Sequence, residues 1–186
     1  MLSQSYYFFK EVSIVEFFTD KEWAPLFSGS QKHFGILSLL SGTLLTTIIA
    51  ILIALPLGLT IAVYLNEYAP KGFRKVVKPL LEILAAIPTV VYGFFALVVV
   101  TPFLQSIWPS ISGFNSLSAG IVMGIMIIPF VSSLSDDVIS AVPRALKDGA
   151  YGLGATQSET IKRVIVPAAL PGIVGGVLLA ASRAIG

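Results

Sequence analysis

The stretch LLTTIIAILIALPLGLTIAVYL, residues 44–65, contains no charged side chain. A helix needs about 20 mainly apolar residues to cross a bilayer, so this stretch predicts a transmembrane helix. Pro56 does not exclude one, because neighbouring helices or waters can satisfy the backbone groups that a proline frees. The composition agrees: 55% of the residues are hydrophobic and 12% are charged, whereas soluble domains average about 25% charged.

Three further apolar stretches follow the first one. Residues 83–104 are uncharged but contain Pro88 and Pro102, residues 118–134 are shorter, and residues 166–186 carry one charge, Arg183. We therefore expect an all-α membrane protein with four transmembrane helices.

The charges between the spans predict their orientation. Loops 66–82 and 135–165 hold Lys71, Arg74, Lys75, Lys78, Arg144, Lys147, Lys162 and Arg163. The connection between Leu104 and Ser118 holds no charge. Because short cytoplasmic loops are enriched in Lys and Arg, both basic loops are expected in the cytoplasm. Residues 1–33 then form an extracytoplasmic segment, and residues 34–186 form the transmembrane domain.

This orientation leaves the first segment without a means of crossing the membrane. Nothing in residues 1–33 resembles a signal peptide, and residues 180–186 are still largely apolar where the sequence stops. We expect that the natural protein begins earlier, with another membrane helix, and that this sequence is a fragment of a longer one.

Two patterns predict how the helices are arranged. Residues 68–82 contain Phe73, Val76, Val77 and Leu80 among four basic side chains, which predicts a short amphipathic helix on the inner membrane surface. The pairs Gly120/Gly124 and Gly172/Gly176 have the small-xxx-small spacing that lets membrane helices approach closely.

The loop before the last span predicts a compact helical hairpin. Pro143 suits the first turn of a helix, and Gly152 and Gly154 permit a sharp turn. Thr156 and Glu159 have the spacing of a capping box, which opens a second short helix. Such a hairpin can seat in a groove of a partner protein. An ordinary cytoplasmic loop is the alternative.

Arg183 is the one charge within a predicted span. An ionisable group in a span costs a few kcal/mol and usually faces a protein interior or an aqueous path. Its planar guanidinium suits a tetrahedral oxyanion, so a place on a phosphate path is one interpretation. Snorkelling to the outer interface and pairing with a carboxylate beyond the sequence are the others.

Several chemistries are excluded or disfavoured by what the sequence contains. There is no cysteine, hence no disulfide or thiolate metal site, and no P-loop motif for nucleotide binding. A net charge of +2 does not point to nucleic acid. We interpret His33 as a solvated surface residue. Asp136 and Asp137 are interpreted as a cytoplasmic helix end, because adjacent residues on a helix do not face each other as a protease dyad must.

The loop at about 135–167 resembles the EAA loop through which permeases of ABC importers contact their ATPase. That motif reads Glu-Ala-Ala, three residues, Gly, nine residues, then Ile-x-Leu-Pro. The matching residues are Asp148, Gly149, Ala150, Gly154, Val164, Val166 and Pro167. The resemblance implies that Asp148, Gly149, Ala150, Gly154, Val164 and Pro167 couple the chain to an ATPase. Asp148-Gly149 departs from Glu-Ala and weakens the helix by about 1 kcal/mol at the glycine.

Beyond this loop, the chain resembles the PstC-type permeases of phosphate ABC importers. The resemblance is carried by FFTDKEWAPLF, FGILSLLSGTLLTT, ALPLGLTIAVYLNEYAP, LEILAAIPTVVYGFFAL, AVPRALKDGAYGLGATQSETI and ALPGIVGGVLLAASRAIG. It implies a MetI-like helical fold, normally with six spans, in the cytoplasmic membrane of a bacterium or archaeon.

The same resemblance implies a non-catalytic subunit without a cofactor. Its partners would be a second permease of the PstA type, a dimer of ATP-binding subunits and an extracytoplasmic phosphate-binding protein. Inorganic phosphate would then be imported by alternating access. An importer of phosphonate, sulfate or molybdate is the first alternative, and a secondary transporter or channel without an ATPase is the second.

Overall fold

The computed structural model describes Tyr7, residues 12–24 and residues 33–185. Residues 1–6, 8–11 and 25–32 of the predicted extracytoplasmic segment lie outside the described residues, as does Gly186, the predicted end of the fourth span. The chain forms two compact units, Met1–Leu45 and Thr46–Gly186.

The first unit holds a short helix and a minimal strand pair. Helix α2 (Ile14–Thr19) is followed by β1 (Trp23–Ala24) and β2 (His33–Phe34), which pair antiparallel. This ladder is the one departure, among the described residues, from the predicted all-α fold.

His33 is not simply solvated in this unit. Its Nδ1 lies 2.7 Å from Oδ2 of Asp20, the residue that ends α2, and its side chain is 39% exposed. The hydrogen bond to Asp20 raises the pKa of His33. A hydrogen bond from the backbone N–H of Glu22, followed by the one with His33, lowers the pKa of Asp20. The interpretation of His33 as a solvated surface residue agrees with this exposure, but sequence spacing did not show that Asp20 lies beside it.

The long helix α3 (Ile36–Val63) leads into the second unit, where helices make up almost all of the chain. The order continues with η2 (Tyr64–Tyr68), α4 (Lys71–Ala85), α5 (Thr89–Phe95), η3 (Ala96–Val100), α6 (Thr101–Ile107), α7 (Ser116–Ser140), α8 (Arg144–Gly152), α9 (Gln157–Thr160), η4 (Ile161–Ile165) and α10 (Val166–Ile185). The segments labelled η are single π-helical turns that continue their neighbours.

Four helices of the described part are long and apolar enough to cross a membrane, which agrees with the predicted number. They are Ile36–Tyr68, Thr89–Ile107, Ser116–Ser140 and Gln157–Ile185. Each of them extends beyond at least one predicted end, because the backbone hydrogen bonds continue into neighbouring residues. The second short helix of the loop is therefore the start of the fourth span and not a separate element.

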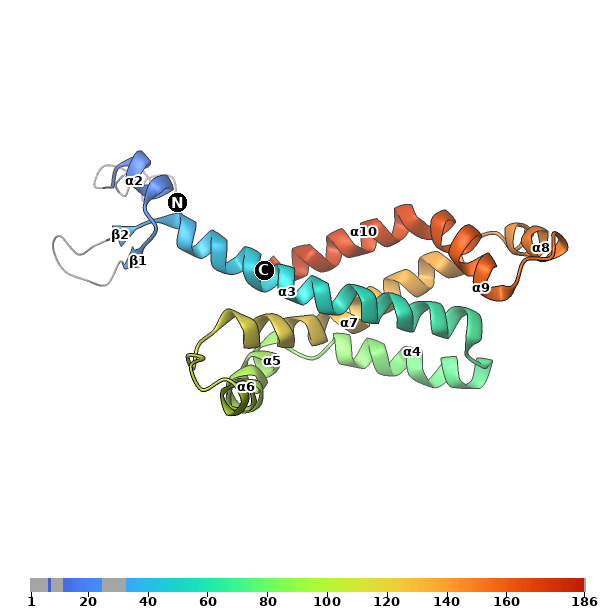
Figure 1. The fold of residues 1–186 in the computed structure, drawn as a ribbon, viewed down its shortest axis with the longest axis horizontal. Helices are drawn as coiled ribbons and strands as arrows, with labels where there is room; N and C mark the ends of the chain where they lie inside the picture. Colours follow the sequence, from blue (N-terminus) through green and yellow to red (C-terminus); the bar gives the residue numbers. More distant parts are fainter. Residues whose placement is uncertain (1–6, 8–11, 25–32, 186) are drawn as a thin grey trace. The chain divides into compact units, whose positions relative to one another are not determined.

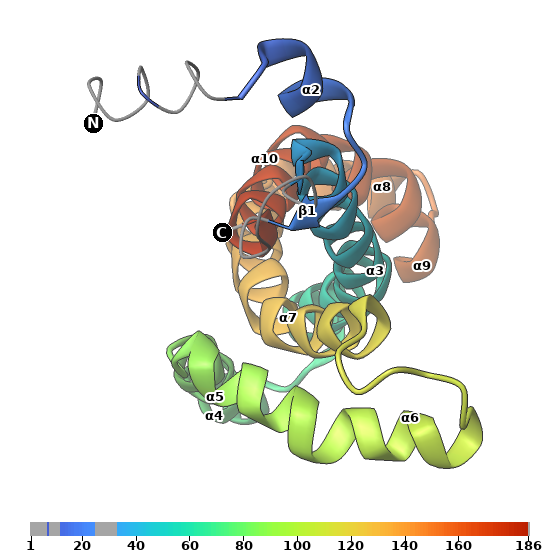
Figure 2. The ribbon, with the colours of Figure 1, turned by 90° about the vertical axis from the view of Figure 1, so that its left-hand side faces the viewer.

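The predicted second span, residues 83–104, is broken at Pro88, whereas Pro102 lies within α6. Ile83 belongs to the end of α4, and a new helix begins at Thr89 after Pro88. Proline lacks an N–H and disfavours a helical conformation in the residue before it, which favours a break at this position. The helix Thr89–Ile107 runs across α7 and not along it (Figure 2).

Helix α7 forms the centre of the second unit, and its neighbours cross it at glycines. A Cβ on Gly120 would lie 2.7 Å from the side chain of Ile49 on α3, and one on Gly124 would lie 3.0 Å from Ile53. A Cβ on Gly172 of α10 would collide with Val138 of α7. The close approach predicted from both glycine pairs is confirmed. The buried cluster between these helices contains Ala50, Ala54, Met126, Ile127, Val131, Ala180 and Ala184.

Helix α4 packs along α7 (Figure 1). Its polar face is turned inward and its apolar face outward, the reverse of a surface helix in a water-soluble protein. Its basic side chains Arg74 and Lys78 face α7. Its large apolar side chains are exposed instead: Phe73, Val76, Leu80, Ile83 and Leu84. The sequence predicted the amphipathic helix itself but not this packing.

Candidate coupling loop and its surroundings

The predicted hairpin is present, and we call residues 144–160 the coupling hairpin. Pro143 caps helix α8, and Gly154 turns the chain with a φ of 83°. A left-handed φ of this kind is readily adopted by glycine and costs other residues energy. Thr156 and Glu159 form both hydrogen bonds of the capping box that opens α9. Gly152, expected in the turn, lies instead within α8.

The sequence-predicted coupling residues are placed on or beside this hairpin. Asp148, Gly149, Gly154 and Pro167 are exposed, while Ala150 and Val164 are half-buried. Pro167 and Val164 lie past the hairpin, in η4 and the first turn of α10.

The tip of the hairpin carries large apolar side chains that face outward. Leu146 is 46% exposed, Tyr151 is 43% exposed and Leu153 is 92% exposed. Tyr151 and Leu153 were not among the predicted coupling residues. Their signal in the sequence is a large apolar residue on each side of Gly152, in a stretch where small and polar residues prevail. A hairpin with an exposed apolar tip can bind a groove in another protein by a helix-in-groove contact.

One residue of η2 contacts both helices of the coupling hairpin. Lys147 of α8 forms an ion pair of 2.5 Å with Glu67, and the two side chains are 20% and 8% exposed. The side-chain amide of Gln157, the first residue of α9, donates to the main-chain oxygen of Glu67 at 2.8 Å. The sequence did not identify this contact, since Glu67 and Lys147 lie 80 positions apart.

Asp136 is the centre of a buried ion network between α4 and α7. The Nη2 of Arg74 donates to both carboxylate oxygens at 2.9 Å, and Lys78 donates to one at 3.2 Å. Asn66 adds a hydrogen bond of 3.1 Å. The Asp136 side chain is 3% exposed, so two cations and an amide together satisfy a buried carboxylate.

Asp136 and Asp137 both lie near the end of α7 at Ser140, as the interpretation of a helix end implies. That interpretation did not include the burial of Asp136. The side chain of Asp137 is 59% exposed. It accepts a hydrogen bond from Lys78 at 2.7 Å, which raises the pKa of that lysine and keeps it charged.

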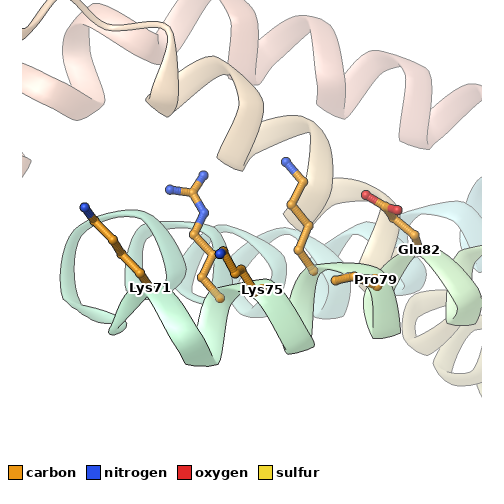
Figure 3. A pocket seen from close by; sticks show the side chains of 6 residues that line it. Lys71, Lys75, Pro79 and Glu82 are labelled. Atoms are coloured by element: carbon orange, nitrogen blue, oxygen red, sulfur yellow. The ribbon is translucent and has the colours of Figure 1, made fainter.

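The basic side of α4 also borders a shallow pocket (Figure 3). Its lining residues are Lys71, Arg74, Lys75, Lys78, Pro79 and Glu82. Arg74 and Lys78 belong to the network with α7, whereas Lys71, Lys75 and Glu82 are exposed. The pocket is thus the outer edge of the ion network.

Arg183 lies apart from the coupling residues, in the last turn of α10, while the hairpin lies at the other end of that helix (Figure 1). Its Nη2 donates to the main-chain oxygen of Ala85 at 2.9 Å, and its guanidinium carbon lies 5.4 Å from the ring centre of Phe130. Within the described residues this is its one hydrogen bond, and a guanidinium offers five N–H donors. The side chain is half-buried.

Several long apolar helices joined by short loops are the features of a multi-pass helical membrane protein. Residues 54–186 match the family described as binding-protein-dependent transport system inner membrane component. The chain belongs to this family of transport permeases.

Curated relatives match most of the chain. A probable ABC transporter permease protein, YqgH, of Bacillus subtilis (strain 168) is 41% identical over 94% of this chain and 56% of its own length. The phosphate transport system permease protein PstC of Mesorhizobium japonicum is 40% identical over 91% of this chain and 57% of its own length. The chain thus spans less than two thirds of the length of these relatives.

A solved structure supports the fold. The chain resembles a chain in a crystal structure of the MetNI methionine ABC transporter in an inward-facing conformation, with a TM-score of 0.62 and 22% sequence identity. The match covers 82% of this chain and 68% of the solved one. The predicted MetI-like fold is confirmed.

Proposed function

We propose that this chain is part of the permease subunit of an ATP-driven importer that moves inorganic phosphate across the cytoplasmic membrane of a bacterium or archaeon. The observation that carries the proposal is the coupling hairpin, whose turn at Gly154 and exposed tip follow the spacing of a permease coupling loop. Phosphate is supported by the relatives that are named phosphate permeases.

The proposed importer includes four kinds of subunit besides lipid: this permease, a second permease, ATP-binding subunits and a binding protein. A dimer of ATP-binding subunits would receive the hairpin, with Asp148, Gly149, Ala150 and Gly154 at or near the contact. Val164 and Pro167 would transmit its movement into α10, because η4 and α10 continue the same helix. A second permease of the PstA type and an extracytoplasmic phosphate-binding protein complete the importer. The chain itself has no catalytic role in this proposal.

Alternating access would follow from movement of the hairpin. When the ATP-binding subunits close, a rigid hairpin seated between them moves with them and tilts the helices to which it is joined. Arg183, at the far end of α10, would then offer its remaining donors to a phosphate oxygen. Arginine binds tetrahedral oxyanions well because its planar fork gives two parallel hydrogen bonds.

The test is uptake of labelled phosphate by proteoliposomes that contain the full-length permease with its partner subunits. We expect uptake to require ATP and the binding protein. Excess phosphonate, sulfate or molybdate should not compete, and competition by one of them would assign the importer to that anion. Uptake that persists without ATP but needs a proton gradient would instead indicate a secondary transporter.

Arg183→Ala tests the pathway within the same assay. Losing a charge-assisted hydrogen bond of about 1.5–3 kcal/mol should lower phosphate uptake by roughly ten- to a hundredfold, with the complex still intact on gel filtration. Arg183→Lys should recover only part of the rate, because lysine cannot bind in a bidentate manner. Unchanged uptake in the alanine variant would remove Arg183 from the pathway.

A further inference from the structure

We propose that Glu67 is the positioning residue that holds the coupling hairpin and passes its movement to the first span. This inference rests on the proposed function, since it assigns to one residue the link between the hairpin and the transmembrane helices. Glu67 lies outside the coupling motif in sequence and was not part of the predicted site.

Both halves of the hairpin meet at this one residue. Lys147 of α8 binds the carboxylate of Glu67, and Gln157 of α9 binds its main-chain oxygen. The Glu67 side chain is 8% exposed. Exposed ion pairs contribute little because water and salt screen them, but this shielded pair is screened much less.

The hairpin has few other means of holding its first helix in place. None of the residues of α8 is buried, and its large apolar side chains Leu146 and Tyr151 face outward. Because α8 packs against η4 without fully burying any of its own residues, its orientation depends strongly on its polar contacts. The ion pair between Lys147 and Glu67 is the one that ties α8 to a membrane-spanning helix within the described residues.

The residue before Glu67 ties the same turn to a second span. Asn66 donates to Asp136 and to Ser140, both on α7. Both residues lie in the π-helical turn η2 at the end of the span Ile36–Tyr68. Single π-helical turns occur frequently at functional sites. A displacement of the hairpin must therefore either break the Glu67 contacts or carry η2, and with it the ends of α3 and α7.

The test reverses the charges in the full-length permease assembled with its partner subunits. The measured quantity is phosphate transported per ATP hydrolysed in proteoliposomes. Glu67→Lys and Lys147→Glu should each lower this ratio by about tenfold, which lies within the usual range of coupling between linked sites. The double reversal restores the pair with opposite polarity and should recover most of the ratio.

Matched controls use the same residue changes on α4. Glu82→Lys and Lys75→Glu alter exposed residues of α4 that form none of the ion pairs found among the described residues, and they should keep the parental ratio. If the reversed variants do not assemble, Glu67→Gln and Lys147→Met remove the charge with little change of size and should lower the ratio as well.

The possible failures can be told apart. Parental ratios in the single variants, or a double reversal as impaired as the singles in an intact complex, would overturn the role of Glu67. If instead the unaltered complex binds no ATPase or transports no phosphate, the proposed function itself fails.

Discussion

At the scale of single residues, Asp136 is a buried carboxylate whose charge stabilises the contact between α4 and α7. It forms ion pairs with two cations of α4, Arg74 and Lys78, from a position on α7 that is almost fully buried. A buried charge without a partner is costly. Removing the Asp136 carboxylate would therefore destabilise the protein mainly because the cations that it contacts lose their counter-charge.

We predict that Asp136→Ala destabilises the protein by about 3 kcal/mol, since Arg74 and Lys78 would keep their positions without a buried counter-charge. The melting temperature of the purified complex in detergent measures this. Asp137→Ala is the control, because that side chain is 59% exposed and its loss should cost less than about 1 kcal/mol. Equal shifts for the two variants would contradict the buried network.

His33 and Asp20 predict a pH dependence in the first unit. The pKa of His33 is raised, so its contribution to stability is fully present below pH 6.5 and is lost as the pH rises through the folded value. The pKa of Asp20 is lowered from 3.8, so its contribution is present above that pH and is lost on acidification. The pair therefore stabilises the strand ladder most between about pH 4 and 6.5.

An NMR titration of the His33 ring checks this prediction. We expect a midpoint above 6.5 in the parent protein and a lower midpoint in Asp20→Asn, which removes the charged acceptor. A midpoint at or below 6.5 in the parent would show that the hydrogen bond does not persist in solution.

At the scale of elements, the tip of the coupling hairpin should separate binding from stability. Leu153 is 92% exposed, so Leu153→Asp should leave the melting temperature unchanged. Burial of this side chain in a groove would make it an interface anchor, whose loss costs about 2 kcal/mol or more. We expect the ATP-binding subunits to be lost from the purified complex, and Leu153→Met to retain them. Retention in the aspartate variant would place the contact elsewhere.

The crossing of α7 and α10 gives a second prediction for elements. Gly172→Ile would force a side chain against Val138, and overpacking of this kind costs about 1–3 kcal/mol. Gly175→Ile is the matched control on the same helix, because a Cβ there meets no atom within 4 Å. Thermal unfolding of the two variants should differ by this amount, and equal stability would argue against the tight crossing.

At the scale of the whole molecule, local patterns predicted most of the elements. Long apolar stretches with at most one charge predicted the four spans. The residue types at Gly154, Thr156 and Glu159 predicted the hairpin. Both features depend on neighbours within a few positions. The break at Pro88 could have been predicted from the same rules, but the apolar run around it favoured one continuous span.

Contacts between distant parts were beyond the reach of such patterns. Glu67 pairs with Lys147 across 80 positions and Asp136 pairs with Arg74 across 62. Considered alone, each of these charged residues is of a type that is common in loops and at helix ends. The tertiary packing of α4 against α7 and of α8 beside η2 brings these charges together, so neither ion pair could be predicted from the sequence.

The outward apolar face of α4 has a consequence for how the chain is made. A ribosome completes α4 before it reaches Asp136, 62 residues after Arg74. At about 5–20 residues per second, the basic side chains wait roughly 3–12 s for their counter-charge. During that delay the nascent helix is best accommodated at the lipid headgroups, with its cations toward water. Its final position is then reached only after translation of α7, so the order of synthesis dictates the order of assembly.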